Sequence, residues 1–207
     1  MAGRAILLAT GNPAKSAKLR WLLEDLGLAP STLADHPDLR LPDETGGSFR
    51  ANAELKAVVA SRACDGLAIA SDGGVVIPAL GDAWDALRTG RAAGPHATDE
   101  AKARQLLSLM AGKRGDDRRV TWSEAVAVAD RGTLTAAWDT TETHGVLTET
   151  YDPAHAIPGF WVYSLWYFPE ASKRYVELTP AELEGQDRTW MALREQARRF
   201  FQGWPGP

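Results

Sequence analysis

The 207-residue sequence contains a single cysteine, Cys64, and this scarcity limits the chemistry open to it. One cysteine excludes an intramolecular disulfide framework and any zinc site built from several cysteines. Long apolar runs are also missing, and none reaches the roughly eighteen residues that a membrane-spanning helix needs. The first apolar run, AILLA at 5–9, is too short for the core of a signal peptide. We therefore expect a soluble, cytoplasmic protein with no membrane partner.

Positive charge is in short supply, because 23 Lys and Arg residues face 27 Asp and Glu residues, which gives a formal net charge of −4. A nucleic-acid partner would need a broad basic face, so we expect none. Hydrophobic residues make up 44% and charged residues 24%, a balance typical of globular proteins that excludes disorder. Tryptophan is plentiful, with eight residues, and this indicates planar binding surfaces, an interface or an aromatic core.

The first third of the sequence alternates between apolar, strand-like runs and segments with helical periodicity. The expected elements are a strand at 5–9, a helix at 14–26, a short strand at 31–34, a helix from about 48 to 63 and a strand at 67–70. The polar residues Ser71–Gly74 are expected to close the last strand as a turn. This alternation predicts an α/β fold whose functional loops lie at strand ends.

The remaining sequence predicts further strands and helices around the same sheet. The expected elements are a helix at 99–110, paired strands at 120–129 and 132–143, an aromatic strand or edge loop at 159–168, and one or two helices over 180–201. No interdomain linker or repeat interrupts them. We expect a mixed, twisted central sheet flanked by helices, arranged as two lobes.

The segment ATGNPAK at 9–15 places polar groups at the start of the first predicted helix. Thr10, Asn12 and Lys15 surround a helix N-terminus, where free N–H groups and the dipole favour an anion. Two interpretations remain open for this segment alone. It is either an anion-binding turn or an ordinary capped turn with a solvated lysine.

Acidic residues flank the second helix and follow the third strand, at Glu44 and Asp72. Two carboxylates beside a phosphate site suit Mg²⁺, which takes one or two carboxylates together with phosphate oxygens and water. Acidic loop residues are otherwise usually solvated. Lys56, on the second helix, either reaches inward or lies in solvent.

Three segments in order carry a resemblance to a known family: TGNPAK at 10–15, ETGGSFRANAELKA at 44–57 and ASDGGVVIPALG at 70–81. They resemble the motifs of the inosine triphosphate pyrophosphatase family, and HATDEAKARQLLSLM at 96–110 is similar to the helix that follows them. The segment 159–179 resembles the family's GFGYDP segment. The resemblance covers most of the chain and implies a single pyrophosphatase-like domain over residues 1–207, with a nucleotide cleft between its lobes.

The resemblance implies an Mg²⁺-dependent hydrolase that converts a nucleoside triphosphate to the monophosphate and pyrophosphate, and a homodimer. It assigns the triphosphate to Thr10, Asn12, Lys15 and Lys56. It assigns catalysis to Asp72 and Lys15 and the metal to Glu44 and Asp72. Further substrate contacts are expected from the second half of the chain, at Phe160, Trp161, Tyr163, Lys173 and Arg188.

The sequence departs from the family pattern mainly where the family reads the base. The family's paired acids are Ser71 and Asp72 here, and Tyr163 stands where the family has an aspartate. The family's Ser-His-Arg recognises the 6-keto group of the purine, and in ungapped register it becomes Asp187, Arg188 and Thr189. A one-residue shift would instead align Arg188 with the family's arginine, but the histidine is lost in either alignment. We therefore predict altered base recognition, for a non-standard or modified purine. The alternative is a nucleotide-binding homologue that has lost hydrolysis.

Overall fold

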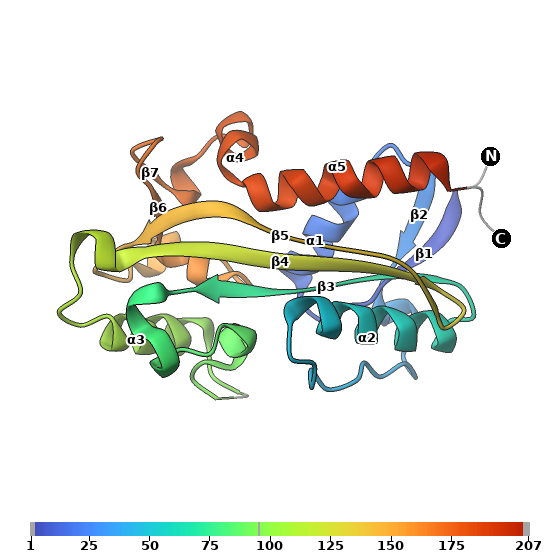
Figure 1. Ribbon diagram of the computed structural model, residues 1–207, viewed down its shortest axis with the longest axis horizontal. Coiled ribbons are helices and arrows are strands. Elements are labelled where there is room, and N and C mark those ends of the chain that lie inside the picture. The colour runs from blue at the N-terminus through green and yellow to red at the C-terminus, as the bar shows by residue number, and fades with distance from the viewer. Residues whose placement is uncertain (1–2, 95, 205–207) are drawn as a thin grey trace. The chain divides into compact units, whose positions relative to one another are not determined.

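The computed structural model describes residues 3–94 and 96–204, and its strands form one seven-stranded mixed sheet in the order β2-β1-β3-β4-β5-β6-β7 (Figure 1). The strands are β1 (Arg4–Leu8), β2 (Leu28–Ser31), β3 (Leu67–Val76), β4 (Arg119–Asp130), β5 (Thr133–Leu147), β6 (Trp166–Phe168) and β7 (Lys173–Arg174). The α-helices are α1 (Pro13–Leu22), α2 (Phe49–Ala63), α3 (Asp99–Leu109), α4 (Pro180–Gln186) and α5 (Arg188–Gly203). The predicted α/β class with a mixed sheet is confirmed.

The chain divides into two compact units, which are described separately below. Unit 1 comprises residues 1–72, 124–140 and 190–207, and unit 2 comprises residues 73–123 and 141–189. In the part of the chain that the structure describes, no helix has the length and apolar character needed to cross a membrane.

The core of unit 1 is built from small side chains between α2 and the strands. On α2, Ala53, Ala57 and Ala60 pack against alanines of β3 and β4, at positions 68, 70, 125, 127 and 129. Because side chains alternate across a strand, these alanines define one face of the sheet, which we call the α2 face. Alanine lets helix and sheet approach closely, and this closeness brings polar side chains of α2 within reach of β3.

The other face of the sheet in unit 1 is covered by α1 and α5. Figure 1 shows α2 and α5 on opposite sides of the strands. On α5, Trp190 and Leu193 are fully buried, and Arg194 lies 4.3 Å above the ring of Trp21 from α1. The sheet of unit 1 is therefore covered on both faces, which explains the uninterrupted apolar runs at 5–8 in β1 and 67–70 in β3.

The structure corrects the boundaries of three predicted elements. The residues Ser71–Gly74 form no turn, because β3 continues unbroken to Val76. The first helix ends at Leu22 rather than residue 26, since Asp25 and Gly27 adopt left-handed φ angles of 63° and 67°. The second strand covers Leu28–Ser31 instead of 31–34. Ser48 and Thr179, whose residue types are common at N-caps, cap α2 and α4.

Unit 2 is held together by an aromatic cluster. The rings of Trp122, Tyr163 and Trp166 follow one another at centroid distances of 5.1 Å, and Phe160 meets Tyr163 edge-on at 5.6 Å. Tyr175 packs on Tyr163 at 4.4 Å. Burial of such large rings makes a large contribution to the hydrophobic stabilisation of this unit.

Candidate functional site

Asp72 lies at the centre of a buried polar cluster on the α2 face of unit 1. Its Oδ1 is 3.2 Å from Lys56 Nζ, and its Oδ2 accepts a hydrogen bond of 2.9 Å from Asn52 Nδ2. Lys56 Nζ also pairs with Glu44 Oε1 at 2.8 Å. Asp72, Lys56 and Asn52 are 5%, 7% and 1% exposed. The two charged groups and the amide are therefore largely shielded from contact with water. Two carboxylates thus converge on one ammonium group.

Helix α2 positions this cluster through its first turns. Ser48 caps the helix by accepting the N–H of Ala51 at 3.1 Å. Asn52 Oδ1 accepts the N–H of Gly46 at 2.7 Å, which fixes the loop that carries Glu44. Asn52 and Lys56 are four residues apart and so lie on one side of the helix, facing β3. A single asparagine therefore orients both Asp72 and the loop of Glu44.

A second buried ion pair lies in the same unit, between Lys15 on α1 and Glu124 on β4. Lys15 Nζ is 3.1 Å from Glu124 Oε1, and the two side chains are 12% and 0% exposed. Burial lowers the pKa of Lys15, but the charges of Glu124 and Asp72 outweigh burial and hold this pKa above its usual value. Lys15 therefore stays protonated, and its field reaches Asp72.

The carboxyl group of Asp72 is tuned by opposing effects. Burial raises the pKa of Asp72 above its usual value, while the charges of Lys15 and Lys56 oppose this rise. A carboxylate with a raised pKa is a better proton acceptor than a solvated one. The buried carboxylate of Asp72 is thus a stronger proton acceptor than a solvated aspartate.

The turn between β1 and α1 is capped by Asn12, but Lys15 is largely buried and not solvated as the interpretation of an ordinary capped turn assumed. Asn12 Oδ1 accepts the N–H groups of Ala14 at 2.9 Å and Lys15 at 3.2 Å, and Thr10 Oγ1 accepts the N–H of Asn12 at 3.1 Å. These bonds hold the start of α1 so that Lys15 points toward Glu124. Strand β1 pairs in parallel with β3, with Leu8 opposite Ile69, so Asp72 lies beyond the end of β1. The turn and Asp72 therefore share one end of β1.

The donor set suits a divalent cation only in part. Among residues 3–94 and 96–204, no group of three or more His, Cys, Asp or Glu side chains is arranged to hold a metal ion. Glu44 and Asp72 nevertheless converge on a positive charge, that of Lys56. Two carboxylates fit the requirements of Mg²⁺ when phosphate oxygens and water supply the other ligands.

In unit 2, three residues expected to bind substrate are buried among aromatic rings. Phe160, Trp161 and Tyr163 are 6%, 4% and 1% exposed. Trp161 meets Trp84 edge-on at 6.5 Å, and Trp84 donates its indole N–H to the carbonyl of Val75 at 2.7 Å. The structure therefore places these rings in the packed interior of the unit, and their contact with a substrate stays a prediction.

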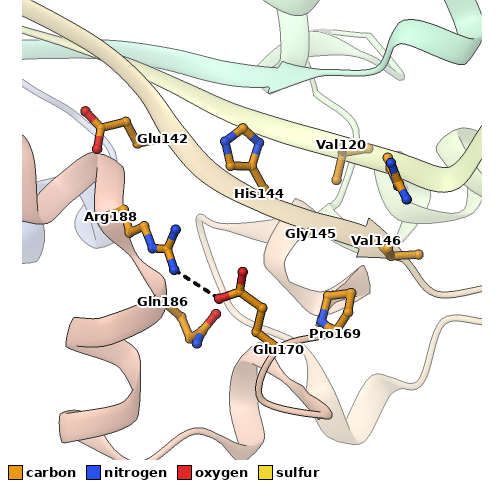
Figure 2. A pocket seen from close by; sticks show the side chains of 10 residues that line it. Val120, Glu142, His144, Gly145, Val146, Pro169, Glu170, Gln186 and Arg188 are labelled. Carbon is orange, nitrogen blue, oxygen red and sulfur yellow. Dashed lines mark hydrogen bonds and ion pairs between the residues drawn. The ribbon is translucent and has the colours of Figure 1, made fainter. Parts of the chain in front are cut away.

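The remaining expected substrate residues, Lys173 and Arg188, carry ion pairs within unit 2. Lys173 Nζ is 2.6 Å from Glu182 Oε1. Arg188 donates to Glu170 Oε2 at 3.0 Å and lines a cavity of about 390 Å³, shown in Figure 2. Strand β5 contributes Glu142, His144 and Val146 to this cavity. Arg188 thus faces the cavity, whereas its sequence neighbours Asp187 and Thr189 are buried.

Asp187 and Thr189, which flank Arg188, belong to a buried hydrogen-bond network in unit 2. Thr189 Oγ1 accepts the N–H groups of Glu142 at 2.9 Å and Thr143 at 2.8 Å, and it donates to the carbonyl of Trp122 at 3.2 Å. Thr143 Oγ1 donates to Asp187 at 3.2 Å. This network fastens the start of α5 to β4 and β5.

Sequence reasoning missed two members of the unit 1 cluster, Asn52 and Glu124. Glu124 carries the clearest signal, since it is one charge in the otherwise apolar run EAVAVA of β4. Asn52 lies one helical turn before Lys56, on the same side of α2. A buried charge in a strand core indicates a partner, but the sequence does not show which residue provides it.

Comparisons with known proteins agree with this architecture. A model of the Ham1 family matches residues 6–201. The dITP/XTP pyrophosphatase of Exiguobacterium sp. is 32% identical over 194 residues, which cover 94% of this chain and 93% of the relative. The dITP/XTP pyrophosphatase of Thermus thermophilus is also 32% identical, over 98% of this chain and 95% of its own. A HAM1 protein from Coxiella burnetii matches in fold with a TM-score of 0.77 at 24% identity, covering 96% of this chain and 98% of its own.

Proposed function

Since the chain belongs to the Ham1 family, we propose that it is an Mg²⁺-dependent nucleoside triphosphate pyrophosphatase that releases pyrophosphate and a nucleoside monophosphate. The observation that carries this proposal is the buried cluster of Asp72, Lys56, Glu44 and Asn52. The names of the relatives support a triphosphate substrate. A homodimer and a cytoplasmic location stay predictions.

The charge balance of unit 1 supports the requirement for a divalent cation. Glu44, Asp72 and Glu124 supply three carboxylates, and Lys15 and Lys56 supply two ammonium groups. When all five are ionised, a triphosphate meets a site with an excess of negative charge. Mg²⁺ held by Glu44 and Asp72 would offset that excess and polarise the attacking water.

The residues of this chain account for the remaining steps of hydrolysis. Asp72, oriented by Asn52, takes the proton of a water whose oxygen attacks the α-phosphorus. The bond between the α-phosphorus and the bridging oxygen breaks, and pyrophosphate leaves with the electron pair. Lys15 and Lys56 stabilise the negative charge that develops on the leaving group. Thr10 and Asn12 hold the turn that presents Lys15.

We also propose that base recognition differs from that of the dITP/XTP pyrophosphatases. Asp187 and Thr189 are committed to a hydrogen-bond network with Thr143, and Tyr163 is packed among aromatic rings. A site that lacks buried donors aimed at a 6-keto oxygen loses the strong rejection that such donors provide. We place the contact with a non-standard or modified purine at Arg188, because this residue lines a cavity.

Substitution of Asp72 by asparagine tests the proposed activity. A screen of natural and modified nucleoside triphosphates with Mg²⁺, which measures pyrophosphate against orthophosphate, is expected to find a substrate that yields pyrophosphate. Asp72→Asn should lower kcat by about 100-fold or more, because the general base is lost. Asp139→Asn, on β5 at an exposed position, is the matched control.

A second candidate function is nucleotide binding without turnover. Ser71, a hydroxyl where the family pattern has an acid, favours it. Tight nucleotide binding by the unmodified protein, with no product from any nucleotide, would establish this alternative and overturn the hydrolase.

A further inference from the structure

Ser71 and Glu124 lie on the same face of the sheet, on the neighbouring strands β3 and β4. Ala70 and Asp72 point to the α2 face, so Ser71 between them points to the opposite face. Ala125 also points to the α2 face, so Glu124 shares the face of Ser71. Both residues are 0% exposed and belong to unit 1.

The two positions differ in what their polar atoms contact. The hydroxyl of Ser71 has no hydrogen-bond partner among the residues that the structure describes, although it is fully buried. Glu124, on the same face, pairs with Lys15. A buried hydroxyl without a partner is unfavourable and indicates a position whose chemistry has changed. The carboxylate missing at position 71 thus has a counterpart one strand away.

We propose that Glu124 is a positioning residue that replaces the second carboxylate of the expected acid pair and holds the ammonium of Lys15 for the triphosphate. This inference rests on the proposed function for its biological meaning. Lys15 is buried, and Glu124 is the carboxylate in direct contact with it. A buried ammonium that loses such a contact either loses its proton or turns toward solvent. Its field on the phosphates therefore depends on Glu124.

Removal of the Glu124 charge is expected to weaken the binding of phosphate by Lys15. Without Glu124, Lys15 ceases to act as a fixed cation, so the site loses one negative and one positive charge together. Its net charge stays the same, while one phosphate donor disappears. The affinity for phosphate should therefore fall, although the net charge of the site does not change.

Binding of inorganic tripolyphosphate with Mg²⁺, measured by calorimetry, tests the proposal in four proteins: wild type, Glu124→Gln, Ser71→Asp with Glu124→Gln, and Asp139→Asn as the control. We expect Glu124→Gln to raise Kd by about tenfold, the scale of one charge-assisted contact. Ser71→Asp should restore most of this loss, because it returns a carboxylate to the same face. With a nucleotide substrate, Glu124→Gln should lower kcat as well as raise KM, because Lys15 also stabilises the charge that develops on the leaving pyrophosphate.

The outcomes separate this proposal from the proposed function. An unchanged Kd in Glu124→Gln, or a double variant that binds no better than Glu124→Gln, overturns the role of Glu124. If Glu124→Gln does not fold, recovery of folding in the double variant supports the proposal, and continued unfolding overturns it. A wild-type protein that hydrolyses no nucleotide refutes the pyrophosphatase, while the tripolyphosphate series still decides the role of Glu124.

Discussion

Asn52 is the residue on which the geometry of the acidic cluster depends most. It donates to Asp72 and accepts from the backbone of Gly46, so it links the proposed general base to the loop of Glu44. At Gly46, an added Cβ would lie 2.7 Å from Asn52 Oδ1, which shows how closely that loop approaches. The side chain of Asn52 therefore fixes the position of this loop relative to β3.

The variant Asn52→Asp separates the two contacts of this side chain. A carboxylate at position 52 still accepts the N–H of Gly46, but it cannot donate to Asp72 and repels it. We expect kcat to fall by about tenfold or more, the effect of losing one hydrogen bond to a charged group. Steady-state release of pyrophosphate measures the change.

A matched control for Asn52→Asp is Glu54→Gln, on the exposed side of the same helix, where Glu54 pairs with Arg50. Its kcat should equal that of the wild type. Equal rates for Asn52→Asp and the wild type would show that Asp72 needs no orientation by α2.

The tryptophans show at the residue level what composition leaves open. Eight tryptophans are compatible with a binding surface, an interface or a core. In the structure, the rings of Trp122, Trp161, Trp166 and Trp190 are 0–4% exposed. Composition reveals the number of rings, but their burial depends on neighbours that are distant in sequence.

At the scale of elements, the local signals of the sequence identified helix starts better than strand ends. The N-caps Ser48, Thr98 and Thr179 each accept a backbone N–H of the following helix, as their residue types predict. The extent of β3 was missed, because Ser71-Asp72-Gly73-Gly74 has the composition of a turn. Pairing with neighbouring strands overrides that local preference, and this tertiary effect is not visible in the sequence.

Helix α4 begins with a capping box that also contacts Lys173, a residue expected to bind substrate. Glu182 forms a capping box with Thr179 and pairs with Lys173. The hydrogen bond from Lys173, together with those from Thr179, lowers the pKa of Glu182 to about 2, from an ordinary 4.5. Both contacts favour the ionised carboxylate, so the start of α4 depends on that charge.

This depressed pKa predicts a loss of stability in acid. Above pH 4.5 Glu182 is ionised in the folded and unfolded chains, and its contribution to stability is complete. As the pH falls from 4.5 toward about 2, the unfolded chain takes up the proton first, and the contribution is lost progressively. Glu182→Gln should therefore flatten the dependence of unfolding free energy on pH in this window.

Denaturant unfolding at a series of pH values checks this prediction. Glu184→Gln, at an exposed position of the same helix and outside the capping box, should retain the pH dependence of the wild type. Parallel curves for Glu182→Gln and the wild type would contradict the role given to the Lys173–Glu182 contact.

At the scale of the whole molecule, the arrangement of the candidate site residues was more predictable from the sequence in unit 1 than in unit 2. In unit 1, the motif residues Lys15, Glu44, Lys56 and Asp72 were predicted from type and order, and the structure joins them in two ion-paired groups. The roles of Asn52 and Glu124 were not predicted, because their partners Asp72 and Lys15 lie on other elements. In unit 2, the sequence predicted changed recognition residues, but it did not show that Tyr163, Asp187 and Thr189 belong to the packed interior.

Restoring the family's recognition motif is therefore expected to fail. The triple variant Asp187→Ser, Arg188→His and Thr189→Arg would place a guanidinium at a position that is 0% exposed. It would also leave the N–H groups of Glu142 and Thr143 without their acceptor. We expect the free energy of unfolding to fall by about 3 kcal/mol or more, since several buried groups lose partners at once.

The same reasoning predicts the base preference of the unmodified enzyme and of this variant. With the altered base recognition that we propose, the ratio of kcat/KM for ITP over ATP should stay below about 100 in the wild type. The triple variant should not raise this ratio, because residue 189 supports the start of α5 and faces β4 and β5. Arg188→His alone, at a position that lines a cavity, should fold like the wild type and shift the ratio. A triple variant that folds normally and strongly prefers ITP would show that the recognition surface persists and that only its side chains were exchanged.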